Sequence, residues 1–285
     1  MRAPEADPGS LSVAAHLGFE GSTGRHRMAL RPMASDAWLE PDANREWQLA
    51  EKARLLAEDR ARYVLDPMTP VADAAATQLA ERLAEHLAAE MGASLVDGAS
   101  AIERCGRSTQ EDWCLMIRED TWRLRAACLC FPSRWVLAEK AGGTIAEIHA
   151  PVPRYDTELG GLVESFSDRL RRDRSMWRTN WNLWDDPRLS QPFTEADSVR
   201  FDPPSADEVG ERAFLRVERQ GLHRLADDAI AFTIRVHQRP IAWLVDQPGA
   251  IDALRSALTG GGAASLAEKK LGHLGPAILT WLASH

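Results

Sequence analysis

Residues 214–237 read FLRVERQGLHRLADDAIAFTIRVH, and the fold assignment starts from this stretch. Two runs, Phe214–Leu225 and Ile230–His237, are rich in apolar and β-branched residues and flank the pair Asp227-Asp228. Strand-forming runs on either side of a short polar turn are typical of a β-hairpin. The stretch therefore predicts two neighbouring antiparallel strands.

Three further strands are predicted upstream of this hairpin. Asp112–Arg118 and Trp122–Phe131 are dense in Trp, Leu, Ile and Cys and flank the polar pair Glu119-Asp120. They predict a second hairpin for the same reason as the first. Met176–Trp184, which reads MWRTNWNLW, predicts one more strand.

The order of these elements predicts an α+β fold. Two strands are followed by helices predicted at Pro132–Ala141 and Thr157–Arg172, and then by three strands. This order resembles that of a PAS-like domain, a five-stranded antiparallel sheet with helices covering one face, although other α+β folds share it. Such a sheet and its covering helices form a natural pocket for a flat cofactor.

Composition and periodicity divide the chain into four predicted parts. They are a flexible N-terminal arm at 1–25, a helical region packed on the core at 26–100, a PAS-like domain with a C-terminal helix at 101–259 and a tail at 260–285. The helical region rests on apolar stripes at Trp47–Arg60 and Thr77–Met91. The domain is expected to end in a helix at Arg239–Leu258 with a break at Pro248.

Composition excludes several classes of function. The 285 residues carry a net charge of −8, which argues against a nucleic-acid binder and against an anionic membrane surface as the main partner. The N-terminal residues lack the apolar core of a signal peptide, and apolar runs fall short of the ~18 residues that span a bilayer. Four cysteines with no metal-ligand spacing predict buried thiols in a reducing cytoplasm. Nucleotide-binding and hydrolase motifs are missing from the sequence.

His149 differs from the other histidines in its sequence surroundings. It follows the apolar pair Ile145 and Ile148 and precedes Pro151 and Pro153, which stiffen the backbone. An imidazole on a rigid segment beside apolar residues suits an axial metal ligand. From these residues alone, a core histidine with its hydrogen bonds satisfied is the more frequent alternative.

Two strands carry further polar groups. On Phe214–Leu225, alternation places Arg216, Glu218 and Gln220 on one face and Arg219 on the other. These residues suit either an exposed edge strand with a cross-strand ion pair or a site where arginine meets a carboxylate ligand.

On Met176–Trp184, Trp177 and Trp181 alternate with Arg178, Asn180 and Asn182. The tryptophans favour the core, and the alternation also suits a pocket wall with a few polar groups.

Several stretches together resemble the haem-dependent oxidative N-demethylases, a family related to the alpha subunit of a dimethylamine-demethylating enzyme. They are Arg27–Leu39 (RMALRPMASDAWL), Glu111–Leu115, Phe131–Trp135 (FPSRW), Ile148–Pro153 (IHAPVP), Trp177–Trp181 (WRTNW), Leu215–Gln220 (LRVERQ) with Arg224-Leu225, and Phe232–Arg235 (FTIR). FPSRW and IHAPVP in this order and spacing are the most specific. The resemblance spans residues 27 to 245.

The resemblance implies a PAS-like domain that holds haem b, with His149 as the proximal iron ligand. It implies that arginines bind the haem propionates, because guanidinium meets carboxylate in two-pronged geometry. The candidates for this contact are Arg134, Arg178, Arg216, Arg219 and Arg224, with Trp181 as a further contact of the cofactor. Glu218 and Arg178 become the candidate catalytic residues. The Glu218 carboxylate would hold a cationic amine or transfer protons.

The implied activity is that of a haem-dependent monooxygenase. Such an enzyme removes a methyl group oxidatively from a small alkylamine and releases formaldehyde, and oxygen is its co-substrate. A separate reductase would supply electrons from NADPH through flavin or an iron–sulfur centre, because this chain has no recognisable motif for either. The alternative is a haem-containing PAS-type sensor or binding protein for a gas or small ligand.

The sequence departs from the family pattern at two positions. Gly221 stands where a hydroxyl-bearing residue is expected after ERQ, and Arg154 stands where glycine is common after APVP. Both departures bear on the substrate, which the resemblance leaves open.

Overall fold

The computed structural model describes residues 28–34, 37–150, 155, 159–172, 174–194, 202, 204–259 and 274–285. The predicted arm at 1–25 and the glycine run at 260–262 lie outside the described residues. Pro151 and Pro153, which the sequence predicts to stiffen the segment after His149, lie outside them as well.

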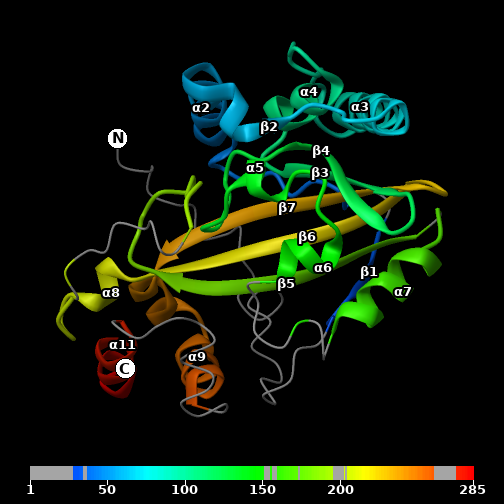
Figure 1. Ribbon diagram of the computed structural model, residues 1–285. Helices are drawn as coiled ribbons and strands as arrows, with labels where there is room; N and C mark the ends of the chain where they lie inside the picture. Colours follow the sequence, from blue (N-terminus) through cyan, green and yellow to red (C-terminus); the bar gives the residue numbers. More distant parts are fainter. Residues whose placement is uncertain are drawn as a thin grey trace.

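One open antiparallel sheet of seven strands forms the centre of the molecule (Figure 1). The strands are β1 (Arg31–Met33), β2 (Val64–Leu65), β3 (Asp112–Arg118), β4 (Trp122–Cys128), β5 (Ser175–Trp184), β6 (Phe214–Ala226) and β7 (Ala229–Pro240). Their order across the sheet is β1-β5-β6-β7-β3-β4-β2. The mixed helix-and-sheet class is therefore confirmed, and so are both predicted hairpins.

The predicted number of five strands is wrong. The two additional strands, β1 and β2, are three and two residues long and lie at the edges of the sheet, where they pair with β5 and β4. Strands this short hold too few residues to show an alternation of apolar and polar side chains, so periodicity cannot detect them. The five predicted strands occupy the centre of the sheet.

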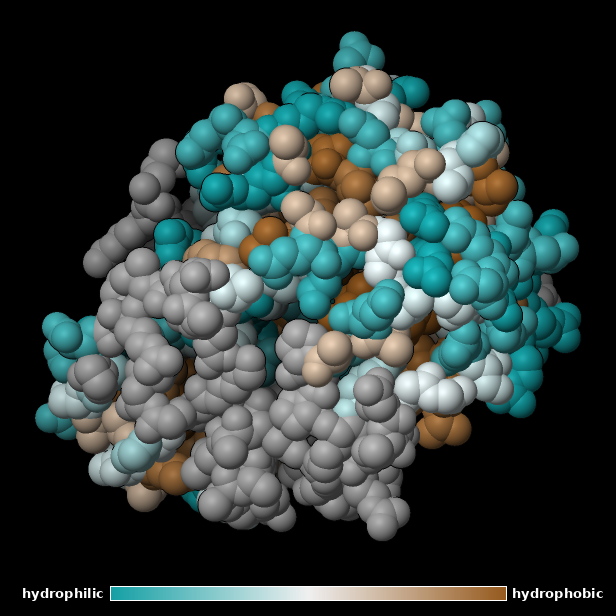
Figure 2. Space-filling view, in the orientation of Figure 1, coloured by the Kyte–Doolittle hydropathy of each residue, from teal (hydrophilic) through white to brown (hydrophobic). Residues whose placement is uncertain are grey.

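The helices lie on both sides of the sheet and at one of its ends (Figure 1). They are α2 (Arg45–Tyr63), α3 (Pro70–Met91), α4 (Ala101–Ser108), α5 (Leu137–Lys140), α6 (Ile145–His149), α7 (Gly161–Arg169), α8 (Val209–Arg212), α9 (Ala250–Thr259) and α11 (Gly275–Ala283). A 3-10 helix, η3 (Ile241–Asp246), follows β7. Figure 2 shows polar side chains over most of the described surface on this side, with small apolar patches between them.

Local sequence sets the ends of α3, the longest helix among the described residues. The Thr69 side chain accepts a hydrogen bond from the Ala72 backbone N–H, and Pro70 takes the first helical position. Gly92 ends the helix in the left-handed conformation, with φ of 59°, which glycine adopts without steric strain. The face that carries Leu79 and Leu83 is fully buried in the main core.

That main core lies between the helices α2, α3 and α4 and one face of the sheet. Leu115 and Ile117 of β3 belong to the same buried cluster as Leu79 of α3 and Ile102 of α4. The short helix α4 is not among the predicted elements. Its eight residues make few turns, and Gly106 packs directly beneath the side chain of Cys128 in β4.

The opposite face of the sheet carries α6 and α7. Trp122, Leu170 and Ile230 form a small buried cluster there, and Ile145 of α6 and Phe166 of α7 pack against it. A third cluster lies at the end of β5 and β6 and joins Trp181 and Leu215 to α8, η3, α9 and α11. The predicted tail therefore contains a helix, α11, that packs into the molecule.

Three predicted helices differ from those observed. Residues 132–141 form only the short α5, because Arg134 has a positive φ of 56° and Ser133 bridges to Gln191. Within the helix predicted at 157–172, α7 is confirmed over Gly161–Arg169, and residues 157 and 158 lie outside the described residues. Residues 239–258 are divided among the end of β7, η3 and α9, with a break at Pro248 and Gly249 as predicted.

A buried ion pair joins α2 to the start of β3. Lys52 Nζ lies 2.9 Å from Asp112 Oδ1, and both side chains are 0% exposed. The ammonium also donates to the carbonyl oxygens of Gly106, Thr109 and Glu111. Burial alone would lower the pKa of Lys52, but the neighbouring Asp112 carboxylate outweighs it and the pKa is raised. The side chain of Lys52 therefore stays charged inside the core.

No helix within the described ranges is long and apolar enough to cross a membrane.

We expect Asp112→Asn to lower the free energy of unfolding by about 3–5 kcal/mol, because it leaves the Lys52 ammonium buried without its counter-charge. Urea denaturation measures the change. Arg54→Gln serves as the control, since it breaks only exposed ion pairs with Glu51 and Glu58, and its expected effect is below about 1 kcal/mol. An equal effect of the two variants would contradict the structural role given to Asp112.

Candidate functional site

The pairing of β5 with β6 gathers polar side chains on one face of the sheet. Arg178 lies opposite Gln220, and Asn180 lies opposite Glu218. Because side chains alternate between the two faces of a strand, these four residues share a face. Ile145 of α6 packs against the buried cluster of Trp122, Leu170 and Ile230, as do Met176 and Leu222 of the same face. The helix α6 and its terminal His149 therefore lie on this side.

Neutral side chains hold the Glu218 carboxylate. The Ser133 hydroxyl donates a short hydrogen bond to Oε1, and Gln220 Nε2 donates to Oε2 at 2.9 Å. The guanidinium of Arg216 is 4.0 Å away. Glu218 is only 8% exposed, so its negative charge acts in a setting where water screens it weakly.

Arg216, two residues before Glu218 on the same face, connects several segments of the chain by hydrogen bonds. Its guanidinium donates to Ser133 Oγ at 2.6 Å and to the carbonyl oxygens of Phe131 and Leu189 at 2.6 and 2.9 Å, and it also donates to Gln238 Oε1. Burial lowers the pKa of Arg216 to about 10, against the opposing effect of the nearby carboxylates. Because an arginine N–H can only donate, Ser133 accepts from Arg216 and its own hydrogen is directed to Glu218.

His149 ends the short helix α6, which begins with a capping box. The Thr144 side chain accepts from Glu147 N–H, and the Glu147 side chain accepts from Thr144 N–H. His149 Nδ1 lies 2.8 Å from the carbonyl oxygen of Ile145. A carbonyl oxygen can only accept, so Nδ1 carries the proton and Nε2 keeps a lone pair.

Burial and charge keep this imidazole neutral. Burial lowers the pKa of His149; the hydrogen bond to Ile145 opposes it, and the positive charges of Arg178 and Lys140 lower the pKa further. The ring stacks on Tyr155, with 4.6 Å between ring centroids and 8° between planes. Within the described residues, His149 Nε2 makes no hydrogen bond.

Arg178 completes the group. Its Nε is enclosed and has no hydrogen-bond partner among the described residues. Burial lowers the pKa of Arg178, against the opposing effects of Glu218 and Tyr155. The site therefore places a neutral imidazole, a guanidinium and a carboxylate on one side of the sheet.

The profile of a family described as haem-dependent oxidative N-demethylase, alpha subunit-like, matches residues 89–279, which is more than half of the chain. The chain belongs to this family. No curated protein matches it.

Membership in this demethylase family confirms the resemblance carried by FPSRW, IHAPVP and WRTNW, all of which lie inside the matched range. The stretch Arg27–Leu39 lies outside it. The family name is that of a haem-dependent oxidoreductase, and its alpha-subunit description points to a partner subunit.

The residues present fit a haem. His149 presents Nε2 with a free lone pair while its second nitrogen is fixed by a carbonyl oxygen, which is the usual arrangement of a metal-binding histidine. Met176, Leu222 and Phe232 lie opposite one another across β5, β6 and β7 and form a half-buried apolar row on the same face as Arg178. A porphyrin needs such a surface beneath its ring.

Two of the residues predicted to contact haem lie on the other face of the sheet. Arg219 donates to the carbonyl oxygen of Ala37 at 2.8 Å and lies 5.3 Å from the ring centre of Trp177. Trp181 is buried in the cluster formed with α8, α9 and α11. The structure does not bring Arg219 or Trp181 together with His149.

The guanidinium groups of Arg134 and Arg224 are engaged in the fold. Arg134 pairs with Asp185 at 2.7 Å and stacks on Trp184 at 3.9 Å. Arg224 donates to Ser167 of α7 and to the carbonyl oxygens of the β6–β7 turn. Together with Arg216, these arginines fasten loops and helices to the sheet.

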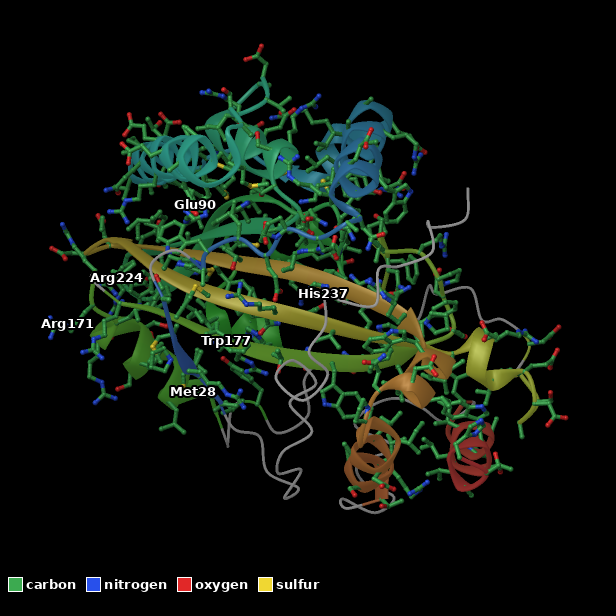
Figure 3. All side chains as sticks on the ribbon, turned by 180° about the vertical axis from the view of Figure 1, so that it is seen from behind. Met28, Glu90, Arg171, Trp177, Arg224 and His237 are labelled. Carbon is green, nitrogen blue, oxygen red and sulfur yellow. The ribbon has the colours of Figure 1, made fainter. Side chains whose placement is uncertain are left out.

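Two other histidines that could replace His149 as a ligand lie in β6 and β7 on the opposite face. His223 bonds to Ser175 Oγ at 2.9 Å, and His237 lies 3.0 Å from a Glu40 carboxylate oxygen. Burial lowers the pKa of His223 to about 3 and that of His237 to about 4. Trp177 and His237 are labelled in Figure 3, which shows the molecule from behind.

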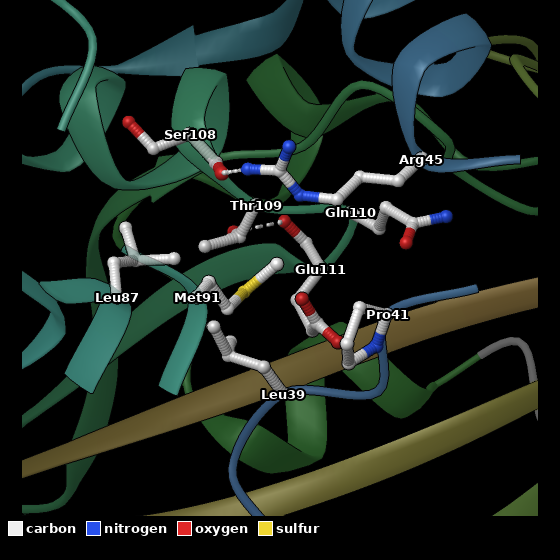
Figure 4. A pocket seen from close by; sticks show the side chains of 9 residues that line it. All are labelled: Leu39, Pro41, Arg45, Leu87, Met91, Ser108, Thr109, Gln110 and Glu111. Carbon is white, nitrogen blue, oxygen red and sulfur yellow. Dashed lines mark hydrogen bonds between the residues drawn. The ribbon is translucent and has the colours of Figure 1, made fainter. Parts of the chain in front are cut away.

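A cavity between α3, α4 and the segment before α2 is far from this group. It is lined by Leu39, Pro41, Arg45, Leu87, Met91, Ser108, Thr109, Gln110 and Glu111 (Figure 4). Its volume of about 10 Å³ is close to the size of one water molecule, so it is too small for a cofactor.

Three residues of the site, Ser133, Gln220 and Tyr155, are not among the predicted catalytic and cofactor-binding residues. Ser133 lies inside the FPSRW motif, and Gln220 shares the predicted face of Glu218, so both carried a signal that could have been used. Tyr155 carries none. Its stacking on His149 is a contact in space that no motif or periodicity indicates.

The departure at Gly221 has a structural explanation. Gly221 N–H donates to Thr233 Oγ1 at 3.1 Å, and a Cβ at 221 would collide with that oxygen and lie 2.8 Å from His223 Nε2. Thr233 of β7 thus supplies the hydroxyl in this space. The position is on the face opposite Glu218, and Arg154 lies outside the described residues.

We expect Ser133→Ala to destabilise the protein by about 1–3 kcal/mol, because Arg216 Nε and Glu218 Oε1 both lose a buried partner. Ser133→Thr retains the hydroxyl and is the matched variant, with a smaller expected loss. Urea denaturation compares the two. Equal losses would show that the hydroxyl is not what stabilises the segment.

We also expect acid to destabilise the fold through the buried histidines. His223 has a folded pKa of about 3 against an ordinary 6.5, so below pH 6.5 the unfolded chain binds a proton that the folded chain rejects. Stability should therefore fall as pH falls from 6.5 to 4.5, by up to about 1.4 kcal/mol per pH unit from this residue. His223→Gln should reduce the slope by this amount, and an unchanged slope in this variant would contradict the role given to His223.

Proposed function

We propose that this chain binds haem b between α6 and the sheet face of β5, β6 and β7, with His149 Nε2 as the iron ligand, and that it demethylates a small alkylamine as a monooxygenase. The observation that carries the proposal is the hydrogen bond from His149 Nδ1 to Ile145, which leaves Nε2 deprotonated. Family membership supports the haem dependence.

The reaction consumes two electrons and two protons. An N-methyl amine, oxygen, two electrons and two protons give the amine with N–H in place of N–CH₃, formaldehyde and water. Bound haem supplies oxygen activation for this chemistry. The residues of the chain bind and orient the amine and its proton.

Glu218 is the residue proposed to bind the amine. Alkylamines are protonated at neutral pH, and a carboxylate that is 8% exposed attracts an ammonium group strongly. Ser133 and Gln220 each use one lone pair of the two carboxylate oxygens, so acceptor capacity remains for the N–H of a ligand. Glu218 Oε1 and Oε2 are also the atoms that would receive the ammonium proton before the nitrogen is oxidised.

Electrons are proposed to come from a separate reductase subunit or protein. The alpha-subunit description of the family supports a partner, and NADPH with flavin or an iron–sulfur centre would belong to that partner. We place the protein in the cytoplasm, because its four cysteines are free and buried, as is usual in a reducing compartment.

The PAS-like character of the sheet is part of this proposal. The five central strands follow the chain order expected from the sequence, two before and three after the helices α5, α6 and α7. The alternative role as a sensor requires a signalling helix, for which residues 239–258 are the candidate segment. Those residues instead belong to β7, η3 and α9, and α9 packs into a core cluster, so this observation favours the enzyme.

The absorption spectrum tests the cofactor assignment. The wild-type protein supplied with haem should show a Soret band and about one haem per chain, because His149 is a single ligand site. His149→Gly should lose stoichiometric haem, and added imidazole should restore the band by occupying the vacated position.

His86→Ala is the control, since this histidine lies on α3 within the other layer of the fold. A wild-type protein without a Soret band would contradict haem binding itself. Unchanged haem content and spectrum in His149→Gly would instead transfer the ligand role to another residue, for which His223 and His237 are the next candidates.

A further inference from the structure

The charges around Glu218 do not balance. Arg178 and Arg216 both interact electrostatically with the Glu218 carboxylate, so two guanidinium groups share one negative charge on this part of the face. Arg216 has further carboxylates nearby, at Asp112 and Asp186, and its donors are occupied by four acceptors. Arg178 has no second carboxylate beside it and no acceptor for its donors among the described residues.

Among the described residues of the site, Arg178 is the cation without an ion-pair partner. Across the described residues its side chain makes no hydrogen bond and no ion pair, although its Nε is enclosed. A guanidinium in such a position normally meets a carboxylate or phosphate in two-pronged geometry. An enclosed donor without a partner is unfavourable, so a ligand that supplies an acceptor would bind with a gain in free energy.

Arg178 and Glu218 are also placed to act on one ligand. They lie diagonally across the β5–β6 pair, where the backbones of such positions are roughly 7–8 Å apart, and their side chains are on the same face. No ion pair within 4.0 Å joins them, although both are described. Two opposite charges on one face of a sheet that do not pair with each other can each bind one end of a dipolar molecule.

A purely cationic substrate would use only half of this arrangement. A simple alkylammonium satisfies Glu218 but adds a positive charge beside Arg178 in a partly buried site, where like charges repel strongly. A molecule that carries a carboxylate next to its N-methyl ammonium group satisfies both residues and adds no net charge.

We propose that the substrate is an N-methylated amino acid, whose ammonium group binds Glu218 and whose carboxylate binds Arg178. This inference rests on the proposed function and narrows it from small alkylamines in general to zwitterionic ones. The demethylation follows the balance given above, with oxygen and a reductase partner as co-reactants and formaldehyde and water as products.

The test compares ligands that share the dimethylammonium group and of which only one carries a carboxylate. N,N-dimethylglycine, its methyl ester and dimethylammonium are titrated calorimetrically into the haem-loaded protein at a pH at which all three amines are protonated. The methyl ester keeps the shape and the ammonium group of the amino acid but lacks the carboxylate. We expect N,N-dimethylglycine to bind roughly 10- to 100-fold more tightly than either cation, the range of a charge-assisted hydrogen-bonded pair.

Variants of Arg178 test whether this residue causes the tighter binding of N,N-dimethylglycine. Arg178→Gln should remove it, so that the amino acid and its ester bind equally, and Arg178→Lys should retain part of it. Arg172→Gln is the matched control, because it removes the same charge from an exposed arginine that pairs with Asp227 at the surface. This control should keep the full preference.

Other outcomes separate this inference from the proposed function. Equal or tighter binding of dimethylammonium by the wild type would overturn the inference while leaving demethylation of a simple amine in place. Loss of haem from Arg178→Gln, read from its absorption spectrum, would overturn it too, because Arg178 would then bind the carboxylates of the cofactor. A wild-type protein that takes up no haem would overturn both.

Discussion

The buried contact between Lys52 and Asp112 connects the helical layer to the functional face. The Lys52 ammonium gathers the end of α4 and the start of β3, and the Asp112 carboxylate accepts hydrogen bonds from the backbone N–H groups of Cys130 and Phe131. Phe131 in turn accepts from Arg216 through its carbonyl oxygen, and two residues later Ser133 binds Glu218. A chain of charge-assisted hydrogen bonds therefore runs from α2 to the carboxylate of the site, and the position of each group depends on the one before it.

The central strands are predictable because each is a run of seven or more residues rich in apolar side chains, and polar pairs mark the turns of both hairpins. The alternation of side chains along a strand predicts that Glu218 and Arg219 lie on opposite faces of the sheet, and the register of β6 confirms it. Sequence cannot say which arginines have free donors, since that depends on carbonyl groups brought from distant segments. Arg134 and Arg224 lie in stretches that match the family. Their guanidinium groups nonetheless bind Asp185 and the carbonyl oxygens of the β6–β7 turn. The edge strands β1 and β2 and the helix α4 escape prediction because each is short and is stabilised by its neighbours in space.

The candidate site combines three groups whose states depend on one another. The cation of Arg178 disfavours a second positive charge on His149, and this keeps the imidazole neutral. Burial lowers the pKa of Arg178, and the negative charge of Glu218 opposes this effect. The guanidinium therefore remains charged, although its Nε has no hydrogen-bond partner among the described residues. Haem dependence follows from the family to which the chain belongs. The proposed roles of the individual residues follow from this arrangement of charges and from the tautomer of His149.

Gly221 and Thr233 occupy one space from two strands, and this has an evolutionary consequence. A serine at 221 could not coexist with the present threonine, because its Cβ and the Thr233 hydroxyl would require the same volume. A side chain at position 221 therefore requires a smaller residue at position 233, whereas glycine at 221 leaves position 233 free to vary. Evolution can consequently move the hydroxyl from β7 to β6 only if position 233 changes first.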